Sequence, residues 1–183
     1  MVKLKSVIRK IKIKLCSNEQ FIKMLRKEGM TIGKGCNIAK TIVIGDEPYL
    51  VSIGDNVRLT HNVQLITHDG SIWTLRKLGL VDKESVLYGR IVIGDNCNIG
   101  WNAMILPNVT IGDNCIIAAN SVVTKNVPAN SVVAGVPARV VENIDVCSTA
   151  CFMRCTCTEG LVCRNCCNGC CCIPSFGKHS KCA

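Results

Sequence analysis

Aliphatic residues recur every six positions over residues 91–126, a spacing that fits neither a helix nor the two-residue alternation of an ordinary strand. Residues that accept tight bends, mainly Gly, Asn and Asp, follow each aliphatic position. The register is unbroken over six repeats: Ile93, Ile99, Ile105, Ile111, Ile117 and Val123. A six-residue period with a recurring bend predicts a mainly β fold, a parallel β-helix in which each six-residue rung forms one short wall.

Three walls per coil would place each residue beneath the residue eighteen positions later, so that Ile93 lies under Ile111. The same period occurs earlier in the chain, at Ile32, Ile38, Ile44, Ile53, Leu59 and Leu65. We therefore predict a β-helix domain over residues 31–145. Ile44 and Ile53 are nine residues apart, and residues 69–90 lack the repeat. We interpret residues 69–90 as a long loop that leaves the β-helix, and long loops in compact domains are usually functional.

Residues 1–30 are predicted to form a short N-terminal helical segment that is basic and amphipathic. Aliphatic residues at helical spacing alternate with Lys and Arg over residues 3–15. Ser17 followed by Gln20 predicts a capping box that opens a second helix, ended by Gly29. One interpretation is a helix that caps the open first coil and presents a solvated Lys face. The other is peripheral attachment to an anionic membrane surface.

The net charge of +9 is concentrated at the two ends of the chain. Residues 1–35 carry a net +8, residues 36–146 a net −2 and residues 147–183 a net +3. The repeat region lacks a basic surface interleaved with aromatic residues, so we do not expect nucleic-acid binding. The sequence has no apolar run of eighteen residues and no uninterrupted apolar core of a signal peptide, so we predict a cytoplasmic protein.

Cysteine content separates a C-terminal tail, residues 146–183, from the rest. The tail holds eleven of the fifteen cysteines, and the other four are predicted to be free thiols in the body: Cys16, Cys36, Cys97 and Cys115. The tail admits three interpretations. It is a metal-binding cluster, a disulfide scaffold, which conflicts with a cytoplasmic location, or an aberrant or disordered end without a hydrophobic period.

Two stretches go beyond periodicity. These are NVQLITHDGS, residues 62–71, and IGWNAMILPNVTIGDNCIIAANSVVTKNVPANSVVAGVPARVV, residues 99–141. Over about residues 20–145 the chain resembles the hexapeptide-repeat acyltransferases, in particular the sugar and polysaccharide O-acetyltransferases related to maltose and galactoside acetyltransferases. The resemblance implies a left-handed parallel β-helix, a homotrimer with active sites between neighbouring subunits, acetyl-CoA as donor and a saccharide as acceptor.

The resemblance also implies roles for individual residues. His68, where the long loop opens, takes the place of the family's general base, and imidazole is suited to accept a proton near neutral pH. The family's coenzyme A contacts fall here on Trp101, Ala119, Thr124, Lys125 and Arg139. One further basic position of the family is occupied here by an acidic residue, Glu142, and two turn glycines are replaced by Asn108 and Asn120.

Weaker candidates surround these residues. Asp69 is a candidate for orienting the imidazole or binding a substrate hydroxyl, and Trp73 and Tyr88 are candidates for contacting the sugar. His61 is interpreted as structural or exposed. No metal site is expected in the repeat region. An N-acetyltransferase of an amino sugar or xenobiotic, and a non-catalytic scaffold with a metal-binding tail, stay open as alternatives.

Overall fold

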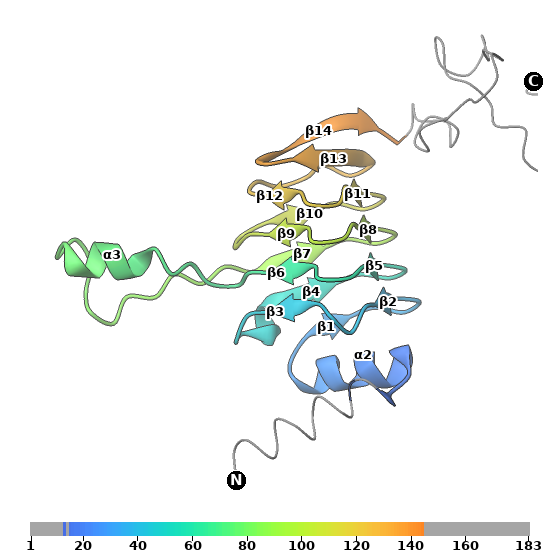
Figure 1. Ribbon diagram of the computed structural model, residues 1–183, viewed down its shortest axis with the longest axis horizontal. Coiled ribbons are helices and arrows are strands. Elements are labelled where there is room, and N and C mark those ends of the chain that lie inside the picture. Colours follow the sequence, from blue (N-terminus) through green and yellow to red (C-terminus); the bar gives the residue numbers. More distant parts are fainter. Residues whose placement is uncertain (1–12, 14, 145–183) are drawn as a thin grey trace, which may run out of the picture. The chain divides into compact units, whose positions relative to one another are not determined.

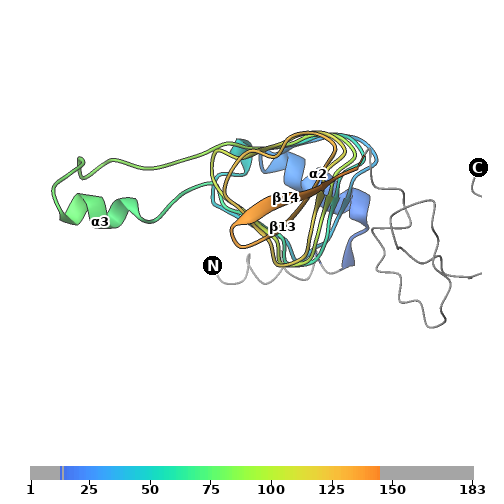
Figure 2. The same ribbon diagram turned by 90° about the horizontal axis from the view of Figure 1, so that it is seen from above.

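The chain winds in successive coils whose strands form three parallel sheets around a common core (Figure 1). The computed structural model describes residue 13 and residues 15–144. The predictions for the first twelve residues and for the tail therefore lie outside the described residues. Viewed down the coils, the three walls enclose a triangular core (Figure 2). This architecture confirms the predicted β-helix.

Each sheet is a stack of short strands from successive coils, and in the second sheet β14 (Ala138–Asn143) follows β13 (Ser131–Gly135) after only Val136 and Pro137. The first, sheet A, has the order β1 (Thr31–Ile32), β4 (Val51–Ile53), β7 (Ile91–Ile93) and β10 (Thr110–Ile111). Sheet B has the order β2 (Asn37–Ile38), β5 (Arg58–Leu59), β8 (Asn98–Ile99), β11 (Ile116–Ile117), β13 (Ser131–Gly135) and β14 (Ala138–Asn143). Sheet C has the order β3 (Val43–Ile44), β6 (Gln64–Leu65), β9 (Met104–Ile105) and β12 (Val122–Val123).

The hydrophobic period sets the register. Ile93 pairs with Ile111, Ile99 with Ile117, and Ile105 with Val123, as the spacing of eighteen predicts. These side chains are buried and form one continuous core. Because the strands from β1 to β12 are only two or three residues long, the stacking of like residues between coils, and not strand length, stabilises these walls.

Asparagine takes the left-handed backbone conformation at the corners. Among the described residues, eight asparagines have φ between 54° and 62°, Asn108 and Asn120 among them. Asn tolerates this conformation better than other residues with a side chain. Side-chain hydrogen bonds also join corner asparagines of successive coils, as between Asn96 Nδ2 and Asn114 Oδ1 at 2.9 Å. The two Asn-for-Gly replacements are therefore compatible with the turns.

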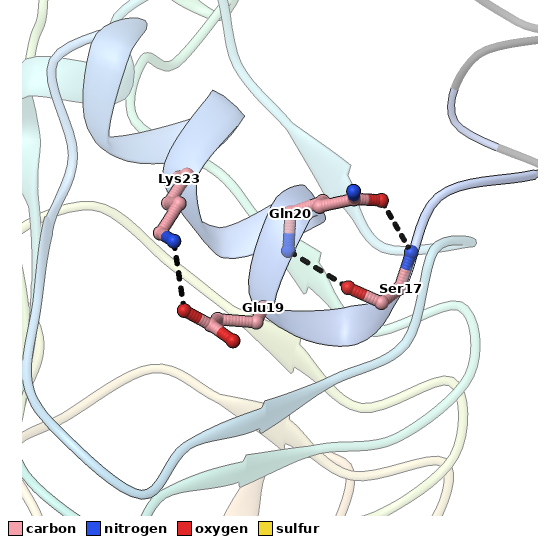
Figure 3. Close-up of polar contacts among 4 residues, drawn as sticks. All are labelled: Ser17, Glu19, Gln20 and Lys23. Atoms are coloured by element: carbon pink, nitrogen blue, oxygen red, sulfur yellow. Dashed lines mark hydrogen bonds and ion pairs between the residues drawn. The ribbon is translucent and has the colours of Figure 1, made fainter.

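Helix α2 (Asn18–Lys27) covers the start of the first coil. Ser17 and Gln20 form the predicted capping box, and Glu19 pairs with Lys23 at 2.8 Å on the exposed side (Figure 3). Gly29 follows the helix with φ of 112°. The buried face of α2 presents Phe21, Ile22 and Leu25 to the core.

Polar side chains of α2 satisfy backbone groups at the sheet edges that no further coil can pair. Asn18 donates from Nδ2 to the carbonyl of Cys36 and accepts at Oδ1 from the N–H of Ile38, both at 2.9 Å. Arg26 donates from Nη2 to the carbonyls of Ile32 and Gly33 at 2.8 and 2.7 Å. Helix α2 is thus an N-terminal cap, which agrees with the capping interpretation of this helix.

The four cysteines of the described residues are free thiols, as predicted. Cys97 and Cys115 are buried and donate to carbonyls, at 3.1 Å to Gly112 and to Pro128 respectively. Burial raises the pKa of Cys97 to about 11. Such thiols are poor nucleophiles and serve here as small core residues.

The segment between β6 and β7 leaves the β-helix and returns to it (Figures 1 and 2). It includes a short helix that the sequence analysis did not predict, α3 (Ile72–Lys77). The two ends of this loop are held together by hydrogen bonds from Asp69 N to Leu87 O at 3.0 Å and from Gly89 N to Thr67 O at 2.8 Å. Within the described part of the chain, no helix has the length and apolar character needed to cross a membrane.

Candidate active site

The site begins where two neighbouring strands of sheet C end. Strands β3 and β6 pair in parallel, with Ile44 opposite Leu65. The segments that follow them therefore start side by side. The first carries Glu47, and the second carries Thr67 and His68.

A buried carboxylate holds the imidazole of His68. Glu47 directly precedes the short 3-10 helix η1 (Pro48–Leu50) and is 8% exposed. Its Oε2 lies 3.0 Å from His68 Nδ1 and accepts a hydrogen bond from Thr67 Oγ1 at 2.6 Å. The Thr67 hydroxyl is the main cause of a lowered pKa of Glu47; burial opposes the shift, and His68 adds to it.

This geometry assigns the two nitrogens of His68. An ionised carboxylate only accepts hydrogen bonds, so Nδ1 carries the proton in the neutral ring. The lone pair then lies on Nε2. Because the side chain of His68 is 46% exposed, a substrate has access to the ring. The arrangement can accept a proton from a bound hydroxyl and return it to a leaving group.

The ends of the loop flank the imidazole. Tyr88 forms an antiparallel bridge with His68, and the two rings meet edge to face at 6.5 Å between centroids. Asp69 Oδ1 accepts from Ser71 N at 2.8 Å, which lowers the pKa of Asp69. The partner of His68 Nδ1 is thus Glu47 and not Asp69, whose carboxylate starts the turn into α3.

The other loop candidate lies farther along the chain. Trp73 belongs to α3 and is 61% exposed, with Lys77 Nζ 5.6 Å from its ring centroid. Among the described residues, no hydrogen bond or ring contact joins Trp73 to His68. Tyr88 is therefore the loop aromatic that the structure brings to the imidazole.

Two of the predicted coenzyme A residues lie on the same edge of sheet C as His68. Thr124 and Lys125 directly follow β12, as His68 follows β6. Strands β6, β9 and β12 are successive neighbours, so two strand spacings, about 10 Å, separate the two levels along the stack. Both side chains are exposed.

The remaining predicted coenzyme A residues lie elsewhere on the chain. Trp101 and Ala119 occupy the corner between sheets B and C, where Asn120 N donates to Trp101 O at 2.8 Å. The Trp101 ring packs on His61, with centroids 4.8 Å apart, and His61 Nδ1 lies 3.2 Å from Thr41 Oγ1. Sheet C separates this corner from His68. Arg139 lies on β14 and is exposed.

Metal ligands do not gather in residue 13 and residues 15–144: no group of three or more His, Cys, Asp or Glu side chains there could hold an ion. The Cys-rich tail lies outside this range.

Sequence reasoning missed Glu47 and Thr67. The available signal was the nine-residue interval between Ile44 and Ile53, which adds three residues to one rung. This insertion carries Glu47 and lies one coil before His68. Only the folded structure, in which one full coil brings the chain back to the same edge, shows that Glu47 and His68 are in contact.

Known proteins are similar to this chain in sequence and fold. Residues 90–125 match the family model described as "Hexapeptide repeat of succinyl-transferase". Protein CapG of Staphylococcus aureus is 40% identical over 144 residues, which cover 78% of this chain and 82% of CapG. Galactoside O-acetyltransferase of Escherichia coli (strain K12) is 44% identical over 110 residues, 60% of this chain, and the chain spans only 50% of that relative.

Solved structures are similar to this chain over most of its length as well. A maltose O-acetyltransferase from Clostridium difficile 630 aligns with a TM-score of 0.57 and 34% identity, covering 71% of this chain and 78% of that one. A galactoside acetyltransferase in complex with coenzyme A aligns with a TM-score of 0.58 and 31% identity, covering 77% and 80%. The chain belongs to the hexapeptide-repeat acetyltransferase family. It is an acetyltransferase.

Proposed function

We propose that this protein transfers an acetyl group from acetyl-CoA to a hydroxyl of a saccharide, with His68 as general base. The observation that carries the proposal is the contact between Glu47 Oε2 and His68 Nδ1, which leaves Nε2 as the basic nitrogen of an exposed imidazole. The maltose and galactoside acetyltransferases among its relatives support a sugar hydroxyl as the acceptor.

The proposed reaction needs no covalent enzyme intermediate. His68 Nε2 takes the proton of the acceptor hydroxyl as its oxygen attacks the thioester carbonyl carbon. The tetrahedral intermediate then breaks its carbon–sulfur bond. The thiolate of coenzyme A leaves and takes up the proton from the imidazolium. Glu47 stabilises the imidazolium between these two steps through its ion pair with Nδ1.

For the donor, we propose that Lys125 and Arg139 bind coenzyme A phosphates and that Thr124 contributes a hydrogen bond. Exposed cations suit these anions, since each adds a charge-assisted hydrogen bond. Trp101 and Ala119 are proposed to contact the rest of the donor. Because Trp101 and His68 lie across sheet C from each other, a homotrimer would allow a neighbouring subunit to contribute to one site.

For the acceptor, Tyr88 is the stronger candidate among the loop residues because its ring meets the imidazole of His68. Asp69 and Trp73 are further candidates. We also propose a cytoplasmic location and membrane contact through the basic N-terminus, most of which lies outside the described residues. A surface-polysaccharide precursor is an acceptor compatible with both.

Coenzyme A release and acetylated product, measured with acetyl-CoA and a panel of hydroxyl and amino sugars, test the function. We expect transfer to a hydroxyl sugar and a loss of roughly two to four orders of magnitude in turnover for His68→Ala. His179→Ala, which removes a histidine of the tail, is the matched control. Unchanged turnover of His68→Ala would remove His68 from its role.

The same panel addresses the alternatives. Transfer only to amines would replace the O-acetyltransferase with an N-acetyltransferase. No transfer to any acceptor, together with zinc bound in proportion to the protein and lost when residues 147–183 are deleted, would favour the metal-binding scaffold.

A further inference from the structure

We propose that Thr67 and Gly45 are positioning residues that hold the carboxylate of Glu47 against His68. This inference rests on the proposed function, since it concerns how the general base is held. Neither residue needs to touch a substrate. Both would act through Glu47.

Thr67 supplies a fully buried hydroxyl at the centre of the site. Thr67 is 0% exposed, and its Oγ1 donates to the same carboxylate oxygen that faces His68 Nδ1. An oxygen held by two donors, at 2.6 and 3.0 Å, confines the carboxylate to one orientation. The hydroxyl also replaces water that burial removes from Glu47.

Gly45 leaves the space that Thr67 occupies. A Cβ atom at position 45 would stand 2.1 Å from Thr67 Oγ1 and 3.2 Å from Glu47 Oε2. Atoms do not approach that closely without a bond, so any side chain here would displace the hydroxyl. Since no unusual φ accompanies Gly45, space and not backbone conformation explains the glycine.

The backbone of Thr67 joins the same site to the loop. Its carbonyl accepts from Gly89 N at 2.8 Å, where the loop returns. A Cβ on Gly89 would lie 2.4 Å from Pro107 Cβ, so the returning chain packs closely on the next coil. Thr67 is therefore held from two sides, and its hydroxyl meets Glu47 with little freedom to move.

Several titratable groups lie around Glu47. His68 faces the carboxylate directly, and the Tyr88 ring meets the His68 ring edge to face. Asp69 neighbours His68, and Asp46 precedes Glu47. Glu28 and Lys40 line a cavity of about 590 Å³ that Gly45 and Asp46 also line. The Thr67 hydrogen bond lowers the pKa of Glu47, against the effect of burial.

Thr67→Val tests the hydroxyl, because valine has nearly the same shape as threonine. We expect turnover to fall about tenfold, which is the change in rate that corresponds to the net free energy of one hydrogen bond. The pKa of the Glu47 carboxyl, followed by side-chain NMR of the labelled protein, should rise, because the hydrogen bond that lowers it is lost. Thr67→Ser keeps the donor and should restore both the turnover and the pKa of Glu47.

Thr60→Val is the matched control. The Thr60 hydroxyl donates to the carbonyl of Ile99 at 2.7 Å, in the wall and away from Glu47. Its loss should leave the pKa of Glu47 unchanged. An unchanged pKa of Glu47 in folded Thr67→Val, or the same rise in Thr60→Val, would overturn the positioning role.

Gly45→Ala tests the space for Thr67, with Gly70→Ala as control, since a Cβ on Gly70 meets no atom within 4 Å. We expect Gly45→Ala to raise the pKa of Glu47 as Thr67→Val does, and Gly70→Ala to behave as the parent. If Gly45→Ala fails to fold, the Thr67 variants decide the outcome.

If His68→Ala and Glu47→Gln both retain full turnover, the proposed function fails. If they lose turnover while Thr67→Val changes nothing, only this inference fails.

Discussion

Glu47 illustrates how one residue combines burial, charge and contact in this site. Burial alone would raise the pKa of its carboxyl, yet two donors on one oxygen lower it from the ordinary value of 4.5. Folding therefore stabilises the ionised form of the Glu47 side chain relative to its protonated form. The linkage between proton binding and folding makes this a statement about stability.

The stability that Glu47 contributes should depend on pH. Because the folded pKa is depressed, Glu47 contributes stability that is fully present above the unfolded value of 4.5 and is lost as pH falls through the folded pKa. Urea unfolding of the parent and of Glu47→Gln should show the largest difference in free energy of unfolding near neutral pH. The difference should shrink below pH 4.5. A difference that grows on acidification would contradict the lowered pKa.

Residue identity was easier to predict for His68 than for its partner. His68 stands in a recognisable stretch where the repeat stops, whereas Glu47 lies in an insertion without a motif. The sequence offered Asp69 for orienting the imidazole and did not offer Glu47. Their hydrogen-bond partners distinguish the two carboxylates: Asp69 Oδ1 accepts from Ser71 N, whereas Glu47 Oε2 lies next to the imidazole.

At the scale of elements, α2 shows how a stack of coils can end. The first coil leaves unpaired backbone groups at the edges of β1 and β2. Unpaired edges favour association with other chains, and a cap covers them. The side chain of Asn18 carries a donor and an acceptor, as a peptide group does, and so replaces one residue of a missing strand.

We predict that Asn18→Ala lowers the free energy of unfolding by about 1–3 kcal/mol, because a buried-edge carbonyl and N–H lose their partners. Thermal or urea unfolding measures the change. Glu19→Ala, which removes the exposed pair with Lys23, is the neighbouring control and should leave the melting temperature nearly unchanged. Equal effects of the two variants would show that the Asn18 contacts do not support the edge.

The loop element was predicted in extent but not in structure. Its limits follow from where the six-residue period stops and resumes. Helix α3 is only six residues long, below the length at which a hydrophobic period can be recognised. Arg76 Nε, which donates to Ser85 O at 2.9 Å, ties α3 to the returning chain, and such a contact is not visible in sequence spacing.

At the scale of the whole molecule, the position of Trp101 relative to His68 matters most. The two lie at opposite edges of sheet C in one chain. If both serve one site, as proposed, they must come from different subunits. The predicted homotrimer supplies that arrangement.

Assemblies that mix two variants test whether the site is shared between subunits. We expect His68→Ala chains and Trp101→Ala chains, co-expressed and purified together, to regain activity above either variant alone, because some interfaces then combine two intact residues. Assemblies of His68→Ala chains with chains carrying both changes are the control and should stay inactive. No recovery in mixed trimers, verified by sedimentation, would place both residues in sites formed by one chain.

The sequence by itself determined the repeat, the buried positions and the stacking partners, because a period of six recorded in consecutive residues sets which side chains face inward. It also marked His68, where that period stops. Only the tertiary structure decided what holds the imidazole. Glu47 and His68 are twenty-one residues apart and lie 3.0 Å from each other because one full coil, lengthened by a three-residue insertion, separates them. Local sequence carries no record of that closure.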